Sequence, residues 1–167
     1  MTYLIEALPD TGGTQRQREK EIAYKLLCQL VGFNCTLEHD DNGAPYLSGH
    51  PEYHISISHC RAAVAVAVSK KGPLGIDIEC RRKVSQSLME RVCTQSELNT
   101  IGLSDDPEMA FLRVWTRKEA VLKYRRTGIK GFGSMLDASK ATDCEVKDIY
   151  TGMPDVVASV AYGRKMV

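Results

Sequence analysis

The sequence lacks the features that would indicate a membrane-bound, exported or zinc-binding protein. No apolar run approaches the length of a membrane span, and the first residues, MTYLIEALPDTGG, lack the basic start and long apolar core of a signal peptide. No two of the six cysteines show the C-x-x-C spacing that is typical of zinc sites and redox motifs. We therefore expect a cytoplasmic protein whose six thiols are reduced and mostly buried.

The sequence also has little net charge. Its 167 residues include 22 Lys and Arg against 21 Asp and Glu, so no overall field favours nucleic acid or an anionic membrane as partner. An apolar fraction of 43% with 26% charged residues is typical of a globular protein. There is no repeat, low-complexity tract or long linker, and the length allows one domain or two small halves packed as one unit.

Helix and strand patterns are mixed along the chain. Strands are expected at residues 2–8, 54–59, 62–69, 74–80, 145–150 and 156–162. Helices are expected from the capping box at Thr14 to Gly32, from Gln86 to Cys93, after the capping box at Thr94, and from Pro107 to about Tyr124, beyond which Gly128, Gly131 and Gly133 end the region. Because the two kinds do not alternate strictly, the pattern indicates an α+β fold.

One predicted strand, LGIDIEC at residues 74–80, carries two acids on one face. Side chains alternate along a strand, so the apolar residues share one face while Asp77 and Glu79 share the other. Two neighbouring carboxylates repel each other, and something positive should lie between them. A metal ion, an arginine pair or open water could each fill that role.

The long helix of residues 107–124 has a stripe that changes from apolar to charged. Leu112, Trp115, Glu119 and Lys123 fall on one helical face, at spacings of three and four residues. Such a stripe is typical of a helix that enters a polar pocket. Taken alone, Glu119 and Lys123 could equally form an exposed pair that stabilises the helix by about 0.3–0.5 kcal/mol.

Together, Asp77, Glu79 and Glu119 favour a bound divalent cation. Three carboxylates suit a hard ion that also binds substrate phosphate oxygens, and magnesium fits better than zinc because no thiolate or imidazole has suitable spacing. Basic residues flank both segments: Arg81, Arg82, Lys83, Arg117, Lys118, Lys123, Arg125 and Arg126. A metal beside basic groups implies a polyanionic substrate such as a pyrophosphate.

These segments resemble the signatures of the 4'-phosphopantetheinyl transferases. GIDIE, followed some forty residues later by WTRKEAVLK, is similar to that family's signature pair, and HISISHC and CTQSEL resemble two further segments of it. The matching region spans roughly residues 43–128. A Ser-His pair ahead of GIDIE resembles the monomeric Sfp type. The resemblance implies two similar α+β halves packed as a pseudo-dimer, residues 1–72 and 73–167, in one compact unit.

By this resemblance, the protein would move the 4'-phosphopantetheine arm of coenzyme A onto a serine of an apo acyl or peptidyl carrier protein, releasing 3',5'-ADP. Such carriers serve fatty acid, polyketide or nonribosomal peptide biosynthesis. Asp77, Glu79 and Glu119 match the magnesium ligands, and Glu119 also matches the catalytic base. Lys123 matches the lysine that contacts the pyrophosphate. Ser58 and His59 match residues that hold coenzyme A phosphates, and Arg18 is the candidate for the 3'-phosphate.

The sequence departs from the family pattern at one phosphate contact. Gly43-Ala44-Pro45 stands where the family often has Gly-Lys-Pro, so one expected lysine is missing. Two alternatives remain open from the sequence. One is another magnesium-dependent phosphoryl-transfer enzyme, such as a nuclease; the other is a catalytically silent protein that binds carrier proteins or coenzyme A. We expect a monomer, with neither nucleic acid nor a membrane as partner.

Overall fold

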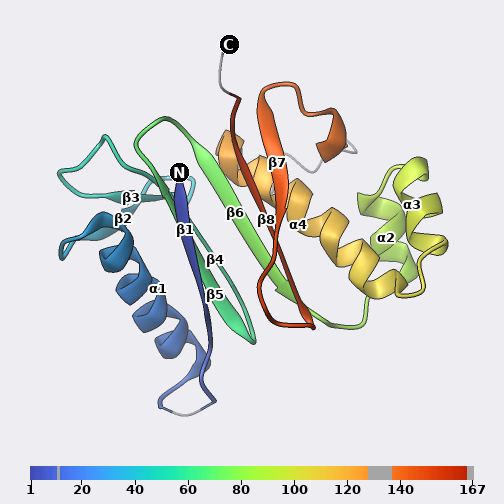
Figure 1. Ribbon diagram of the computed structural model, residues 1–167, viewed down its shortest axis with the longest axis horizontal. Helices are drawn as coiled ribbons and strands as arrows, with labels where there is room; N and C mark the ends of the chain where they lie inside the picture. Colours follow the sequence, from blue (N-terminus) through green and yellow to red (C-terminus); the bar gives the residue numbers. More distant parts are fainter. Residues whose placement is uncertain (11, 128–136, 165–167) are drawn as a thin grey trace.

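The structure, a computed structural model that describes residues 1–10, 12–127 and 137–164, contains two three-stranded antiparallel sheets with their helices (Figure 1). The first part of the chain forms β1 (Thr2–Ala7), α1 (Gln15–Val31), β2 (Leu37–His39), β3 (Pro45–Leu47), β4 (His54–Cys60) and β5 (Ala63–Ser69). The second forms β6 (Leu74–Cys80), α2 (Gln86–Val92), α3 (Gln95–Gly102), α4 (Pro107–Arg125), η2 (Ala138–Lys140), β7 (Cys144–Ile149) and β8 (Val156–Gly163). The predicted α+β class is confirmed.

The two three-stranded sheets share one strand order. The first sheet runs β1–β5–β4 and the second β6–β8–β7, and every pairing is antiparallel. In each sheet the first strand in the chain pairs with the last, and the long helix of that half lies in the chain between the first strand and the other two. This shared connectivity is what two similar halves require. A boundary between residues 72 and 73 stays a prediction.

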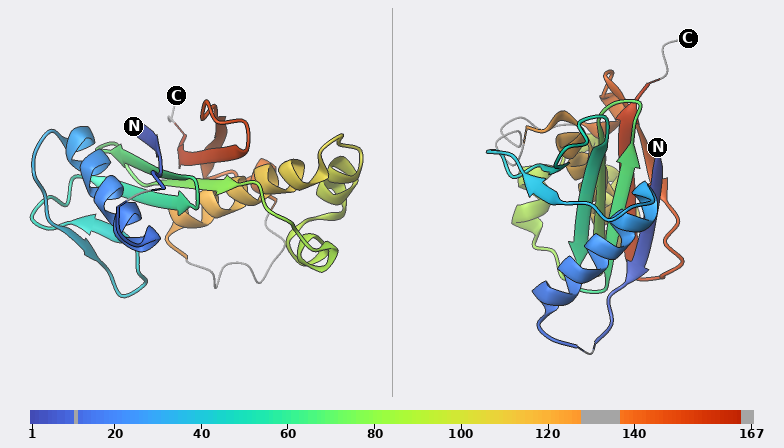
Figure 2. Two further views of the ribbon diagram at one scale, coloured as in Figure 1. Left: turned by 90° about the horizontal axis from the view of Figure 1, so that it is seen from below. Right: turned by 90° about the vertical axis from the view of Figure 1, so that its left-hand side faces the viewer.

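Each three-stranded sheet is covered by one long helix. The apolar residues of α1 pack on β5 of the first sheet, and those of α4 pack on the second sheet. α2 and α3 lie at the N-terminal end of α4, on the side of the molecule away from α1 (Figure 2). None of the helices in the described residues is both long and apolar enough to span a bilayer.

Strand β6 joins the two halves. Leu74, Ile76 and Ile78 belong to one buried apolar cluster that also contains alanines of β5 and valines of β8. The opposite face of β6 carries the two acids and lies under α4. The predicted alternation of LGIDIEC is therefore confirmed: the apolar residues of one face pack in the core, and the acids lie on the opposite face.

The predicted helix caps are also present. Thr14 and Thr94 each form a complete capping box, and Gly32 ends α1 in the left-handed conformation. Asp106 accepts a hydrogen bond from the Met109 amide at the start of α4. The short β2–β3 ladder and η2 were not predicted, because three-residue elements carry too little periodicity to detect. The three glycines expected to end the α4 region lie outside the described residues.

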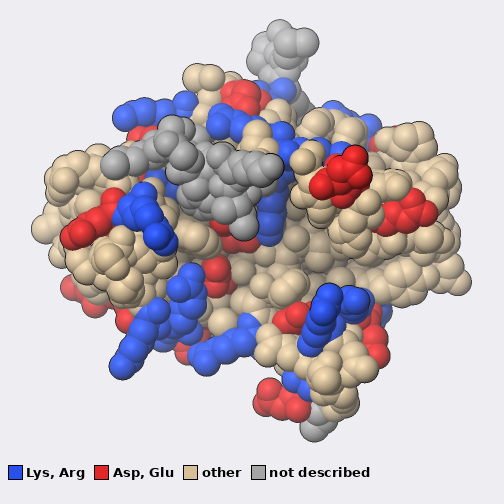
Figure 3. Space-filling model, turned by 180° about the vertical axis from the view of Figure 1, so that it is seen from behind, with Lys and Arg blue, Asp and Glu red and all other residues tan. Residues whose placement is uncertain are grey.

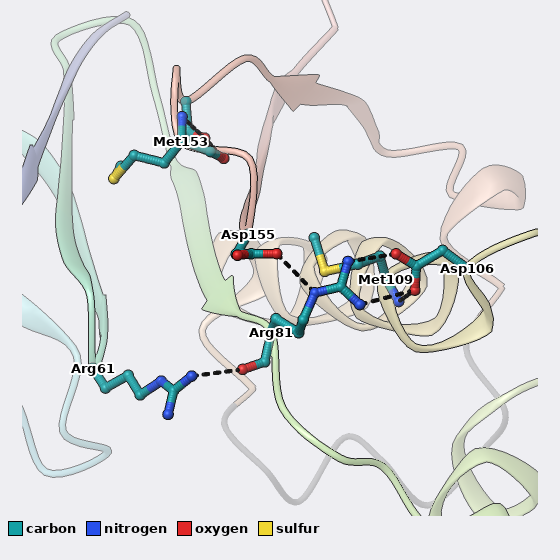
Figure 4. Close-up of polar contacts among 7 residues, drawn as sticks. Arg61, Arg81, Asp106, Met109, Met153 and Asp155 are labelled. Carbon is teal, nitrogen blue, oxygen red and sulfur yellow. Dashed lines mark hydrogen bonds and ion pairs between the residues drawn. The ribbon is translucent and has the colours of Figure 1, made fainter.

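Arg81, expected from the sequence beside the phosphates, instead links three segments of the fold (Figure 4). Its guanidinium donates to Asp155 in the β7–β8 loop at 2.7 Å and to both carboxylate oxygens of Asp106. Its backbone carbonyl accepts from Arg61 at 3.2 Å. Both carboxylates raise the Arg81 pKa, and the guanidinium lowers that of Asp106. Arg81 thus stabilises the start of α4, where its charge is already matched.

Candidate active site

Gly75 lets α4 lie directly on the backbone of β6. A Cβ atom at this position would be 2.1 Å from the Ala120 carbonyl oxygen and 2.5 Å from the Tyr124 amide nitrogen. No side chain fits at such distances, so only glycine allows the helix this close. The approach brings Glu119 and Lys123, one on each side of Ala120 along the helix, to the face of β6 that carries the acids.

Asp77 is the buried centre of the site. It is only 6% exposed, and its Oδ1 accepts hydrogen bonds from the Ser58 hydroxyl at 2.8 Å and the Lys123 ammonium at 2.7 Å. Its Oδ2 is also buried but has no hydrogen-bond partner among the described residues. A buried carboxylate oxygen without a donor is costly, which makes Asp77 a strong candidate for binding a further positive group.

Lys123 enters the site as its inward position in the helical stripe predicts. Besides Asp77, its ammonium donates to the Ile76 carbonyl oxygen at 3.1 Å. The side chain keeps 30% of its surface exposed, so the charge lies at the edge of the buried region. The positive group expected between the acids of β6 is therefore supplied in part by Lys123. Arg82 supplies another charge, at 3.5 Å from Glu79.

The surroundings of the two glutamates raise the pKa of both side chains. Burial is the largest cause that raises the pKa of Glu119 to about 7; Asp77 and Glu79 raise it further, and Lys123 lowers it. Burial also raises the pKa of Glu79, against the opposing effect of Arg82. Because each glutamate is affected by Asp77, the three predicted acids form one electrostatic group, as the sequence suggested.

Glu119 should therefore weaken the metal-free fold at high pH. When the pKa of a carboxylate is raised by folding, the group does not lower the free energy of unfolding at pH values below its unfolded pKa of about 4.5. Above that value the free energy of unfolding falls as pH rises, until pH passes the folded pKa of about 7. We expect Glu119→Gln to raise Tm in chelator by roughly 2–4 °C at pH 8, about 1 kcal/mol after solvent screening. The gain should be clearly smaller at pH 5. An equal gain at both pH values would contradict the raised pKa.

The donor set fits a divalent cation, although the described residues contain no preformed group of three His, Cys, Asp or Glu ligands. The unpartnered Oδ2 of Asp77 is a ready oxygen ligand. A cation beside Asp77, Glu79 and Glu119 would offset the mutual repulsion that raises the Glu119 pKa. With carboxylates alone as donors, the chemistry suits magnesium better than a soft metal.

A cavity of about 320 Å³ opens beside these acids. Gly43 lines it from the loop before β3 and Pro45 from the start of β3, while Glu119 and Lys123 line it from α4 and Arg126 from the C-cap of that helix. Arg126 reaches over this loop, where its guanidinium donates to the Pro45 carbonyl oxygen at 3.3 Å. On the face shown in Figure 3, Lys and Arg side chains lie on both sides of a shallow central hollow.

The three residues proposed from the first half lie in two places. Ser58 is buried beside Asp77, whereas its neighbour His59 points outward, with its Nδ1 3.4 Å from a carboxylate oxygen of Glu19. Arg18 donates to the Gly13 carbonyl oxygen at 2.6 Å, and its buried Nε has no partner among the described residues. His59, which contacts Glu19, and Arg18, which contacts Gly13, therefore both lie near the N-terminal end of α1.

Some of the basic residues expected around the metal have other partners. Arg117 pairs with Asp148 and Arg125 with Asp143, both through two hydrogen bonds. Lys118 is fully buried and donates to Glu97 at 2.7 Å and to the Val92 carbonyl oxygen. Their charges are matched by carboxylates outside the acidic group. Sequence reasoning missed this because every partner comes from a distant segment.

Comparison with known proteins gives a match over the part of the chain that contains these acids. Residues 73–157 match the model of the 4'-phosphopantetheinyl transferase superfamily, a region that contains β6 and α4. The chain belongs to this superfamily. The Sfp 4'-phosphopantetheinyl transferase of Bacillus subtilis is 29% identical over 89 residues, which cover 52% of this chain and 39% of that protein. The resemblance seen in the sequence is confirmed.

Two further relatives agree with this membership. The 4'-phosphopantetheinyl transferase AcpT of Salmonella typhimurium is 33% identical over 90 residues, 51% of this chain and 46% of AcpT. A Haemophilus influenzae relative with a provisional name of the same class is 30% identical over 126 residues, 69% of this chain and 54% of the relative. The chain thus spans about half the length of the curated relatives it matches.

Proposed function

We propose that this chain transfers the 4'-phosphopantetheine arm of coenzyme A to a serine of an apo acyl or peptidyl carrier protein. The observation that carries the proposal is the meeting of Asp77, Glu79, Glu119 and Lys123 where α4 lies on β6, within the region that matches the superfamily. Phosphoryl transfer requires mainly positioning and charge neutralisation, which such a group provides.

The three acids are the proposed magnesium ligands. Oδ2 of Asp77 is free to bind, and the carboxylates of Glu79 and Glu119 share its electrostatic surroundings. When bound, magnesium neutralises the negative charge of the pyrophosphate of coenzyme A. Lys123, at the mouth of the same cavity, is placed to hold the pyrophosphate and to stabilise the departing 3',5'-ADP.

Glu119 is the proposed general base, acting on the carrier serine directly or through water. Its pKa of about 7 is that of the metal-free site; a cation beside it would lower this pKa and keep Glu119 ionised, which is the form that accepts a proton. The serine oxygen would bond to the β-phosphorus as the bond between that phosphorus and the bridging oxygen breaks. The serine proton passes to Glu119, and the bridging oxygen leaves with 3',5'-ADP.

Residues of the first half are the proposed further contacts to the phosphates of coenzyme A. His59 is exposed, and Arg18 lies nearby at the start of α1, so both can reach a ligand from solvent. Ser58 is the third residue that the family pattern assigns to this role, but its hydroxyl proton is donated to Asp77, so a phosphate contact would require that hydrogen bond to break. Arg126 adds a positive charge beside Ala44, where the family often has a lysine, and this supports binding of an anion in the same cavity.

The carrier protein would dock against the basic residues next to this cavity. Arg82 and Arg126 are both about 40% exposed and each lies near one acid, Glu79 at 3.5 Å and Asp40 at 3.7 Å, whereas Arg81 is hydrogen-bonded to two aspartates; the first two therefore suit an acidic partner better. Charges of this kind accelerate encounter and fix orientation. We further propose that the chain acts as a cytoplasmic monomer without nucleic acid or membrane partners, with residues 1–72 and 73–167 as its two halves.

The decisive experiment is transfer to a purified carrier. A panel of apo carrier proteins, mixed with the protein, coenzyme A and Mg2+, should gain one phosphopantetheine arm by mass spectrometry. Chelator should stop the gain, and raised salt should slow it because it screens the docking charges. If all the carriers stay unmodified while the protein binds coenzyme A, the transferase proposal fails and a silent binding protein replaces it.

A further inference from the structure

Two serines of β4 connect the first half of the protein to β6. Strand β6 pairs with β8 on one side. On its other side lies β4, which belongs to the first sheet and forms no backbone ladder with β6. Hydroxyls of β4 take the place of carbonyls there: Ser56 accepts from the Ile76 amide at 3.0 Å and Ser58 from the Ile78 amide at 3.3 Å. Both serines are buried, at 5% and 6% exposure, and satisfy amides that would otherwise lack a partner.

Only one of these serines also contacts the acidic group. A hydroxyl has one proton to donate, and Ser58 gives its proton to Oδ1 of Asp77 at 2.8 Å. Ser56 has the same kind of bond to β6 and nearly the same burial, but no contact with an acid is recorded for it among the described residues. The two serines therefore differ in the contact with Asp77, which only Ser58 makes, and in their place relative to the cavity, which Ser56 lines.

We propose that Ser58 is a positioning residue, which fixes the carboxylate of Asp77 across the junction of the halves so that Oδ2 is presented to the metal. The inference rests on the proposed function, since that function supplies the metal. Lys123 is the other donor to Oδ1, but its ammonium is also the group proposed to hold pyrophosphate. When Lys123 turns to the substrate, Ser58 is the donor that continues to hold the carboxylate.

The test compares Ser58→Ala with Ser56→Ala in the full chain. Each variant removes one hydroxyl that accepts from β6, and Ser58→Ala also removes the donor to Asp77, so Ser58→Ala should lose more thermal stability than Ser56→Ala. Binding of Mg2+ is then titrated by calorimetry without coenzyme A or carrier, which separates this role from any phosphate contact of Ser58. Loss of a partner that orients a ligand weakens metal binding by about 10–100-fold, and we expect this loss in Ser58→Ala alone.

A further variant and two outcomes test the positioning role of Ser58. Ser58→Thr keeps the hydroxyl and should recover most of the Mg2+ affinity, which a role limited to filling space would not require. Equal affinities in the wild type, Ser58→Ala and Ser56→Ala would overturn the positioning role while leaving the transferase proposal intact. A wild type that transfers phosphopantetheine but binds no Mg2+ would overturn the metal assignment and the positioning role together.

Discussion

Gly75→Ala is expected to destabilise the protein more than any other conservative change in the site. The added Cβ would meet the Ala120 carbonyl oxygen at 2.1 Å and the Lys123 Cβ at 2.8 Å, and neither the β6 backbone nor that of α4 can turn aside as a flexible side chain would. Overpacking usually costs about 1–3 kcal/mol, and a clash between two backbones should cost about 3 kcal/mol or more. Denaturant unfolding would measure this loss.

The same substitution should also separate the acids. Moving α4 away from β6 displaces Glu119 and Lys123 from Asp77, so the protein that remains folded should have lost most of its Mg2+ affinity. Gly102→Ala is the matched control, since nothing lies within 4 Å of a Cβ at that helical position. That change should be neutral or stabilise by about 0.5 kcal/mol. A stable, active Gly75→Ala protein would contradict the close approach of α4.

Asp77→Asn is expected to abolish transfer while the protein stays folded. The amide keeps the size of the side chain and one oxygen for Ser58 and Lys123, but it removes the negative charge that is proposed to bind the metal. Because Asp77 is a proposed direct ligand, the fall in kcat/KM should exceed the roughly 10–100-fold that loss of an outer partner causes. Transfer of phosphopantetheine to an apo carrier at several Mg2+ concentrations would measure it.

Asp77→Ala is the less informative variant. Asp77 is buried and binds the Lys123 ammonium, so its removal leaves a partly buried charge without this partner and confounds loss of activity with loss of stability. Circular dichroism and Tm measurements should accompany both variants. Activity of Asp77→Asn near that of the wild type in limiting Mg2+ would overturn the metal assignment.

Much of the fold and the position of the acids could be predicted from the sequence, because both depend on local periodicity. The alternation of LGIDIEC predicted which face of β6 carries Asp77 and Glu79, and the helical spacing predicted that Glu119 and Lys123 share a face. Capping chemistry located the starts of α1, α3 and α4. These features need only neighbouring residues, which the sequence presents directly.

Contacts between distant segments could not be predicted in the same way. The hydrogen bond from Ser58 to Asp77 joins two strands of different sheets, and nothing in HISISHC distinguishes a serine that binds a carboxylate from one that binds an amide. The same limit made Arg81 look available for phosphate, since its partners Asp106 and Asp155 come from other loops. A basic residue that is close to a motif in the sequence can therefore be paired with an acid elsewhere in the fold.

The buried ion pair of Lys118 and Glu97 limits how α4 could be reused in another protein. Lys118 precedes Glu119 in the chain, yet it points away from the acids and its ammonium binds the carboxylate that also caps α3. Removing one partner of such a pair leaves a buried charge uncompensated, at a cost of about 3–5 kcal/mol. Anyone grafting α4 onto a new scaffold would therefore have to transplant the capping box of α3 with it.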